Sequence, residues 1–310
     1  MDARRIGSLR VSVVGIGCNN FGRRLDQAAT DAVVHAALDA GVTLFDTADV
    51  YGDTLSEVML GRALGARRDE AVVATKFGMP LDDTRYGAAP AYVRRACEDS
   101  LARLRTDRID LYQLHYPDES VPIADTLGAL GELVAEGKVR EVGCSNFSAA
   151  QLREAAAAAG SNPAFASVQN QYSLLERSPE RDGVLAACAD LGLALLPFYP
   201  LANGLLTGKV RPGEPPPEGS RLATMPAERA AHWRSPALLE VVGRLLELAA
   251  REGVPLLTLA VAWLLDHAPV ASVIAGASNP EQVRANAAAA QSLAPALRAA
   301  LDEATAPGGP

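Results

Sequence analysis

Cysteine is scarce in this sequence of 310 residues. The four cysteines, Cys18, Cys97, Cys144 and Cys188, lie far apart, and none belongs to a Cys-x-x-Cys pair or to a Cys/His spacing typical of zinc ligands. The pattern therefore suggests neither a disulfide framework nor a metal site. It fits a reducing compartment, so we expect a cytoplasmic protein. The longest apolar stretch, 255–265, is far shorter than the roughly 20 residues that a membrane-spanning helix needs, and no membrane partner is expected.

Positive charge is also in deficit. The 29 Lys and Arg residues are outnumbered by 37 Asp and Glu residues, which gives a net charge of −8. A diffuse acidic surface repels phosphate backbones, so nucleic acid is not expected as a partner. Apolar residues make up 49% and charged residues 21% of the chain, which excludes a disordered protein or a coiled coil. Without an internal repeat or a linker, the sequence predicts a single domain over 1–310.

Short apolar runs alternate with helical stretches along the whole chain. The runs cover 11–17, 42–48, 71–77, 110–115, 139–145, 166–173, 193–200 and 271–278. Most of them lack a polar–apolar alternation, as expected for parallel strands covered on both faces. Eight such strands alternating with helices predict an α/β fold, a (β/α)8 TIM barrel. The alternative is a doubly wound open sheet, but the sequence GIGCNNFG after the first run does not supply the Gly-x-Gly-x-x-Gly turn which that fold would need.

Helix starts are indicated by capping residues and prolines. Thr30, Ser56 and Ser148 are expected to cap three helices, and Pro90 and Pro122 are expected to open two more. Two segments fall outside the alternation. Residues 4–12 predict an N-terminal β-hairpin with a Gly-Ser turn. Residues 202–235 predict a long loop after the seventh strand, which is a lid, a binding loop or a disordered segment.

Polar residues at the strand ends indicate where the chemistry lies, because a barrel carries its active site at the carboxyl ends of its strands. Only three residues are lysines, Lys76, Lys138 and Lys209, and Lys76 ends an apolar strand. A buried Lys76 paired with Asp46 would lower the pKa of a neighbouring Tyr51 phenol from about 10 towards the range of a general acid. His115, on the next strand, is placed to donate to a substrate oxygen. This set suits proton delivery to a carbonyl oxygen.

Six motifs in order along the chain resemble those of the aldo-keto reductase family. They are FDTADVYG, ATKFG, DLYQLHYPD, GCSNFS, VQNQYSLLER and FYPLANGLLTGK. The resemblance extends from the hairpin to about residue 290. It implies a (β/α)8 barrel that reduces aldehydes and ketones with NADPH and binds the dinucleotide without a Rossmann domain.

The resemblance assigns a catalytic tetrad to Asp46, Tyr51, Lys76 and His115. Tyr51 would protonate the carbonyl oxygen, Lys76 held by Asp46 would tune Tyr51, and His115 would orient the carbonyl. The hydride would come from the nicotinamide, and a small carbonyl compound would be the substrate. An alternative within this fold is a redox-sensing regulatory subunit that binds the cofactor with little turnover. A third reading is a Schiff-base enzyme in which Lys76 is the nucleophile.

The resemblance also assigns cofactor contacts. Ser145, Asn146 and Gln169 would bind the nicotinamide carboxamide, and Phe198 would stack on the ring. The following segment would wrap the pyrophosphate with Pro200, Leu201, Gly204, Leu206, Gly208 and Lys209.

The adenosine end departs from the best-known family pattern. Gly276 and Ala277 replace Lys-Ser, Gln282 replaces an Arg, and Asn286 is kept, with Ser278 beside them. NADPH is expected as the cofactor, with NADH or dual use open. Substrate-pocket residues, suggested by their positions in loops, are Asn19, Asn20, Tyr86 and Trp233.

Overall fold

The protein is described from a computed structural model, in which residues 1–306 are placed. Eight parallel strands form one sheet in the order β10-β3-β4-β5-β6-β7-β8-β9. The strands are β3 (Val14–Gly17), β4 (Leu44–Asp46), β5 (Val72–Phe77), β6 (Ile109–Leu114), β7 (Val139–Ser145), β8 (Ser167–Gln171), β9 (Ala194–Phe198) and β10 (Val273–Gly276). The two outer strands meet where Leu195 of β9 bridges Val270 just before β10, through Leu195 N–H to Pro269 O at 2.7 Å and Ala271 N–H to Leu195 O at 3.0 Å. The sheet therefore closes into the predicted (β/α)8 barrel.

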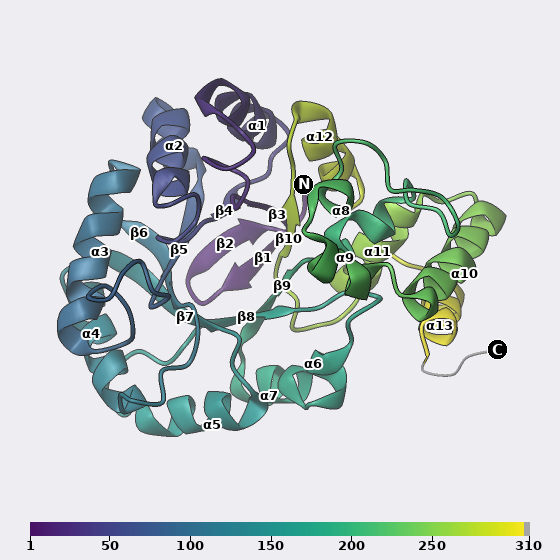
Figure 1. Ribbon diagram of the computed structural model, residues 1–310. Helices are drawn as coiled ribbons and strands as arrows, with labels where there is room; N and C mark the ends of the chain where they lie inside the picture. Colours follow the sequence, from purple (N-terminus) through teal and green to yellow (C-terminus); the bar gives the residue numbers. More distant parts are fainter. Residues whose placement is uncertain (307–310) are drawn as a thin grey trace.

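Helices surround the strands on the outside of the barrel (Figure 1). They are α1 (Gln27–Asp39), α2 (Leu55–Leu64), η1 (Gly65–Glu70), α3 (Pro90–Leu104), α4 (Ile123–Ala135), α5 (Ala149–Ala158), α6 (Ser178–Arg181), α7 (Val184–Leu191), α10 (Pro236–Glu252), α11 (Leu256–Leu265), α12 (Pro280–Ala288) and α13 (Pro295–Ala304). Their apolar faces and the outer faces of the strands share one buried core. This packing explains why the strands read as continuous apolar runs.

The N-terminal hairpin plugs one end of the barrel. Strands β1 (Ala3–Ile6) and β2 (Leu9–Ser12) pair antiparallel around the predicted Gly-Ser turn. Ile6 and Leu9 are fully buried against residues near the starts of the barrel strands, such as Leu44, in a separate apolar cluster. The end at which the strands begin is thus filled with hydrocarbon, which leaves the carboxyl ends for a site.

The helix starts follow the sequence prediction in part. Ser148 caps α5 with a full capping box, in which Gln151 returns a bond to the Ser148 amide. Pro90 opens α3 as predicted, and Pro122 directly precedes α4.

The caps predicted at Thr30 and Ser56 are wrong. Asp26 caps α1 instead and accepts from the Ala29 amide, which places Thr30 inside the helix, fully buried. Ser56 is the second residue of α2, and its hydroxyl bonds to Thr47 Oγ1 at 2.8 Å and donates to Cys18 O at 2.9 Å. The Ser56 hydroxyl, whose sequence position resembled that of a cap, is therefore engaged by tertiary contacts.

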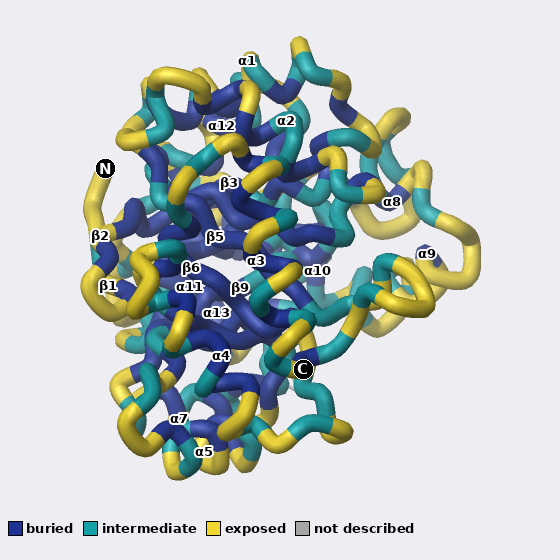
Figure 2. Tube along the Cα trace, turned by 90° about the vertical axis from the view of Figure 1, so that its left-hand side faces the viewer, coloured by how far each residue is buried: buried dark blue, intermediate teal, exposed yellow. Residues whose placement is uncertain are grey.

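The long segment after β9 is not a plain loop. The predicted long segment is present, and it contains the short helices η2 (Ala202–Thr207), α8 (Arg221–Thr224) and α9 (Ala227–Trp233), which the sequence prediction did not include. Figure 2 shows that much of the chain around α8 and α9 is exposed. Short helices of this kind carry too little periodicity to be recognised from sequence.

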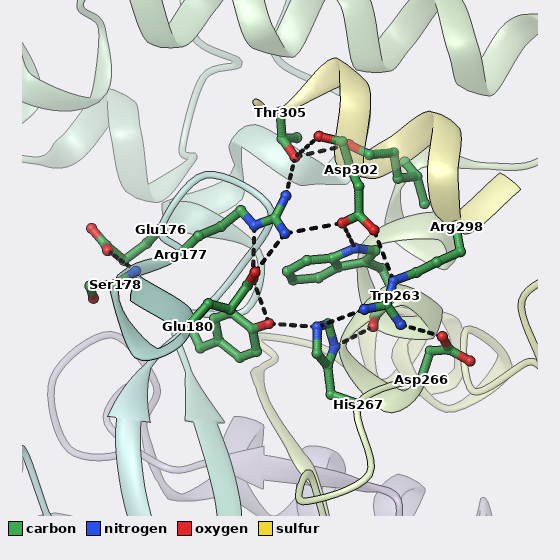
Figure 3. A network of polar contacts seen from close by, with 12 residues as sticks. Glu176, Arg177, Ser178, Glu180, Trp263, Asp266, His267, Arg298, Asp302 and Thr305 are labelled. Carbon is green, nitrogen blue, oxygen red and sulfur yellow. Dashed lines mark hydrogen bonds and ion pairs between the residues drawn. The ribbon is translucent and has the colours of Figure 1, made fainter. Parts of the chain in front are cut away.

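A polar network fastens α13 to the barrel (Figure 3). The Trp263 indole lies between two guanidinium groups, with Arg177 Cζ at 5.0 Å and Arg298 Cζ at 5.9 Å from the ring centre, and it donates to Asp302 Oδ1 at 2.9 Å. Arg177 also pairs with Glu180 at 2.6 Å. Arg177, Glu180 and Asp302 of this network also line a cleft of about 640 Å³ between α6, α10 and α13. Because their charges already pair with one another, we assign the network a structural role.

Within residues 1–306, no single helix is long and apolar enough to cross a membrane. Helices α10 and α11 reach that length and composition only as a pair, and they are bent by 97° relative to each other.

Candidate active site

Four polar side chains from three neighbouring strands meet at the open end of the barrel. Asp46 is the last residue of β4, Lys76 lies in β5, and His115 directly follows β6. Tyr51 lies in the loop that leads from β4 to α2. Because β4, β5 and β6 are adjacent and parallel, their carboxyl ends bring the predicted tetrad together.

Lys76 and Asp46 form a buried ion pair. Lys76 Nζ lies 2.6 Å from Asp46 Oδ2 and also donates to Thr47 O at 2.9 Å. The Lys76 side chain has no exposed surface. Burial alone would lower the pKa of Lys76, but the charges of Asp46 and Tyr51 and their hydrogen bonds outweigh it, so the pKa is raised. Lys76 is therefore held as an ammonium ion.

Tyr51 lies against this ammonium ion. Lys76 Nζ is 5.1 Å from the centre of the Tyr51 ring. Burial raises the pKa of the Tyr51 phenol, while the Lys76 charge acts in the opposite direction. The net shift is upward, so the expectation of a lowered phenol pKa is wrong for the protein by itself. Desolvation wins because the phenol is enclosed and Asp46 neutralises part of the Lys76 charge.

His115 is also a neighbour of Tyr51. The two ring centres are 5.8 Å apart in an edge-on arrangement. Burial and then the Lys76 charge lower the pKa of His115 to about 3, so the imidazole is neutral at physiological pH. Its Nδ1 is buried and has no hydrogen-bond partner among residues 1–306. Tyr116 stacks on the outer face of His115 with ring centres 5.5 Å apart.

A layer of amides supports the ion pair from inside the barrel. Gln169 Nε2 on β8 donates to Asp46 Oδ1 at 2.8 Å, and Gln113 Nε2 on β6 donates to the same oxygen at 3.3 Å. Sequence reasoning missed Gln113. The available signal was its place two residues before His115, on the same face of a strand that is otherwise apolar.

Two more predicted cofactor residues lie at the end of β7. Ser145 Oγ donates to Gln169 O at 2.8 Å. Asn146 has a left-handed φ of 62° and donates from Nδ2 to His115 O at 3.0 Å. These bonds bring Ser145, Asn146 and Gln169 to the edge of the tetrad, and their contact with a nicotinamide stays a prediction.

The segment after β9 curves away in a strained conformation. Phe198 ends the strand, and Tyr199 follows with a φ of 50°. Gly204 has a φ of 102°, which strongly favours glycine, and its O accepts from Thr207 Oγ1 at 2.7 Å. Of the remaining predicted contacts, Pro200 is buried, Leu201 and Gly208 are half-buried, and Lys209 is exposed. Leu206 packs wholly into the core, and neither its side chain nor its backbone has exposed surface.

The predicted adenosine contacts gather at the start of α12. Gly276 ends β10, and the Ser278 amide donates to Gln282 Oε1 at 2.8 Å. Asn286 is buried and donates from Nδ2 to Gly276 O at 3.2 Å. Asn286 therefore shapes the turn through a bond to the protein itself.

Arg221 on α8 is a second residue that sequence reasoning missed. Its Nη2 donates to Asn19 Oδ1 at 3.1 Å and to Asn20 Oδ1 at 3.2 Å, and its Cζ lies 5.6 Å from the Tyr199 ring centre. Asn20 Nδ2 in turn donates to Ser278 Oγ at 3.4 Å. Arg221 thus links the segment after β9 to the loops after β3 and β10.

The predicted substrate-pocket residues separate into two groups. Asn19 and Asn20 lie at the barrel mouth under Arg221. Tyr86 is 55% exposed in the loop before α3, and Trp233 on α9 packs partly against the core. No group of three or more His, Cys, Asp or Glu side chains in the described part of the chain is arranged to hold a metal ion.

Comparison with known proteins agrees with this geometry. The model of the aldo/keto reductase family matches residues 13–304. A solved structure of a glycerol dehydrogenase from Gluconobacter oxydans is similar, with a TM-score of 0.82 and 31% sequence identity. The alignment covers 98% of this chain and 94% of that one. The protein is a member of the aldo-keto reductase family, whose oxidoreductases act on carbonyl and alcohol groups.

Proposed function

We propose that the protein interconverts an aldehyde or ketone and the corresponding alcohol with a nicotinamide cofactor, and that Tyr51 is the general acid. The observation that carries the proposal is the contact between the Tyr51 ring and the buried Lys76–Asp46 pair, with neutral His115 beside it. The similar glycerol dehydrogenase acts, by its name, on an alcohol, which supports the same chemistry in either direction. The catalytic unit is the single domain of residues 1–310.

In the proposed reaction, Tyr51 gives its phenolic proton to the carbonyl oxygen. The Lys76 ammonium stabilises the phenolate that remains, and Asp46 keeps that ammonium in place. His115 is neutral, so its ring can hold the carbonyl oxygen by a hydrogen bond without adding a second charge. The bound nicotinamide supplies the hydride in reduction.

The residues around the mouth fit a dinucleotide. A side chain at Gly204 or Gly276 would meet no other atom within 4 Å, so the backbone is open to a ligand at both places. The guanidinium of Arg221 forms no ion pair within residues 1–306, and the start of α12 offers amide groups to a phosphate. Phe198, Ser145, Asn146 and Gln169 would hold the nicotinamide end. The positive charges of Arg221 and Lys209 would attract the phosphates of a dinucleotide, and NADPH is the cofactor that we propose.

The two alternatives predict different behaviour. Lys76 is fully buried and its pKa is raised, so it is a poor nucleophile for a Schiff base. A redox-sensing regulatory subunit would bind the cofactor yet turn over little. All four residues of the tetrad are in contact here, which favours an enzyme.

The test combines binding with turnover. We expect NADPH to quench the intrinsic fluorescence on titration, NADH to bind more weakly, and small aldehydes to support repeated NADPH oxidation. Glycerol with NADP⁺ tests the reverse direction. Tight cofactor binding without multiple turnover on the whole carbonyl panel would establish the regulatory alternative, and borohydride trapping of a covalent adduct would establish the Schiff base.

A further inference from the structure

Asp49 is a buried carboxyl group for which the proposed reaction has no use. It lies in the segment between β4 and α2 and has no exposed surface. Neither of its carboxyl oxygens makes a hydrogen bond of normal geometry with another side chain or backbone group of residues 1–306. Buried carboxylates normally find partners, so an ionised Asp49 would be costly in this position.

A second buried carboxyl group is bonded to the cation whose charge most favours ionisation of Asp49. Glu57 on α2 is also fully buried, and it accepts from Thr75 Oγ1 at 2.5 Å and from Arg103 Nε at 2.6 Å. Arg103 also donates to Ser100 Oγ at 3.1 Å. Arg103 is therefore bonded to Glu57, and its charge acts on Asp49 without a direct bond.

The remaining groups around Asp49 do not compensate a second negative charge. Lys76 on β5 is bonded to Asp46 and Thr47, on the inner side of the barrel. Tyr92 on α3 and Tyr112 on β6 are neutral phenols whose hydroxyl groups are buried and lack hydrogen-bond partners within residues 1–306. Charge balance therefore leaves Asp49 with a proton. Consistently, burial and then the Glu57 charge raise the pKa of Asp49 to about 7, against the weaker effects of Arg103, the Val50 amide and Lys76.

Asp49 lies in the short segment that joins two members of the tetrad, Asp46 and Tyr51. Its amide donates to Lys76 O at 3.1 Å, and two residues later the Tyr51 amide donates to Ala48 O at 3.2 Å. Just beyond Tyr51, Asp53 and Thr54 have left-handed φ values of 53° and 75°. A backbone strained in this way keeps its conformation only while its anchors hold it.

We propose that Asp49 is a positioning residue: while its carboxyl group is protonated it stays buried and keeps in place the segment that holds Tyr51 over Lys76, and its ionisation displaces Tyr51 and stops the reaction. The inference rests on the proposed function for its kinetic part only. Asp49 touches neither substrate nor cofactor, and it acts through the Tyr51 backbone. The proposal predicts that activity is lost at alkaline pH because Asp49 ionises, and not because a member of the tetrad does.

The first test measures the proton directly, without activity. Infrared spectroscopy of the cofactor-free protein is expected to show a protonated-carboxyl band that titrates with a midpoint near pH 7. Asp49→Asn removes this band. Asp110→Asn is the matched control, because Asp110 is equally buried but accepts from Arg68, Arg140 and the Val73 amide, and this variant keeps the band. A wild-type protein without such a band overturns the proposal, whatever the activity.

The second test is the pH profile of kcat. Wild type and Asp110→Asn are expected to lose turnover about tenfold per pH unit above the infrared midpoint, as for a single ionising group. In Asp49→Asn this alkaline limb of the pH profile, the fall of kcat with rising pH, moves to the higher pH at which Tyr51 itself ionises. An unmoved limb in this variant overturns the positioning role.

Glu57→Gln provides an independent check if Asp49→Asn fails to fold. Without the Glu57 charge, Arg103 becomes the partner of Asp49 and favours its ionised form. The midpoint of the infrared titration and the pH above which kcat falls should then both shift to lower pH, or the protonated-carboxyl band should be absent. An unchanged midpoint in Glu57→Gln contradicts the charge-sharing argument. Absence of turnover in every form would refute the proposed function, while the infrared titration would still decide whether Asp49 carries the proton.

Discussion

The side-chain amide of Gln169 donates to Oδ1 of Asp46 across the interior of the barrel, over 2.8 Å. The other oxygen of Asp46 holds Lys76, so the carboxylate is fixed from both sides. Gln169 was predicted only as a cofactor contact. The bond shows that its Nε2 is engaged by the ion pair, which leaves its carbonyl oxygen to face a ligand.

This contact predicts a double effect for Gln169→Leu. The buried Asp46 oxygen loses its shorter donor, which should cost about 1–3 kcal/mol of unfolding free energy. Cofactor affinity should fall as well. Urea denaturation and fluorescence titration measure the two effects. Gln113→Leu is the matched control, because its bond to the same oxygen is 3.3 Å long, and equal losses in both variants would contradict the special role of Gln169.

Tyr51→Phe should lower kcat by about 10²–10⁴-fold, the usual contribution of a positioned general acid. The ring and its packing on Lys76 remain, so cofactor binding and thermal stability should change little. Steady-state kinetics and cofactor titration separate the two. Tyr116→Phe removes a hydroxyl from the neighbouring aromatic ring and keeps its stacking on His115, so it should retain turnover. Substantial activity in Tyr51→Phe would refute the assigned role.

The Lys76–Asp46 pair predicts a difference between stability and activity. Lys76→Met leaves a buried carboxylate without its cation, which should cost about 3–5 kcal/mol. Adding Asp46→Asn removes that charge and should restore most of the stability, while turnover stays low because the ammonium is absent. Chemical denaturation and kinetics of both variants test this. A double variant as unstable as Lys76→Met would show that packing, and not charge, holds the site together.

His115 should not titrate in the neutral range. Its folded pKa of about 3 lies below the ordinary value of 6.5, because burial and Lys76 disfavour the cation. The stability that this group contributes is therefore complete above pH 6.5 and is lost as the pH falls towards 3. In an NMR titration, the ring resonance that disappears in His115→Asn should stay in its neutral position from pH 5 to 8. A midpoint near 6.5 would show that the site is more hydrated than its packing indicates.

The eight strands, the hairpin and the convergence of the tetrad were predictable because each has a local pattern. Apolar runs mark buried parallel strands, and the strand ends carry Asp46, Lys76 and His115 at the positions where a barrel gathers its polar residues. The caps predicted at Thr30 and Ser56 were wrong because a hydroxyl near a helix start can bond to residues distant in sequence. The Ser56 hydroxyl bonds to Thr47 and to Cys18 O.

The features that could not be predicted depend on long-range contacts. The direction of the Tyr51 pKa shift depends on how far burial outweighs one neighbouring charge, which no spacing reveals. The contact of Arg221 with Asn19 joins residues about two hundred positions apart, through a segment whose two short helices have no sequence period.

That contact gives a final prediction about the segment after β9. Arg221 Nη2 donates to Asn19 and Asn20, and Arg24 Nη2 donates to Gly219 O at 2.7 Å. These polar contacts hold α8 and the residues just before it across the barrel mouth. Arg221→Met keeps most of the side-chain length and removes the donors. A charged hydrogen bond contributes about 1.5–3 kcal/mol, so release of bound NADPH should accelerate roughly tenfold or more. Stopped-flow fluorescence measures the rate.

Arg229→Met, in which an exposed arginine on α9 is replaced, is the matched control and should release NADPH at the wild-type rate. If both variants release it equally fast, the positive charge of the segment governs retention, and the bonds of Arg221 to the loop after β3 do not.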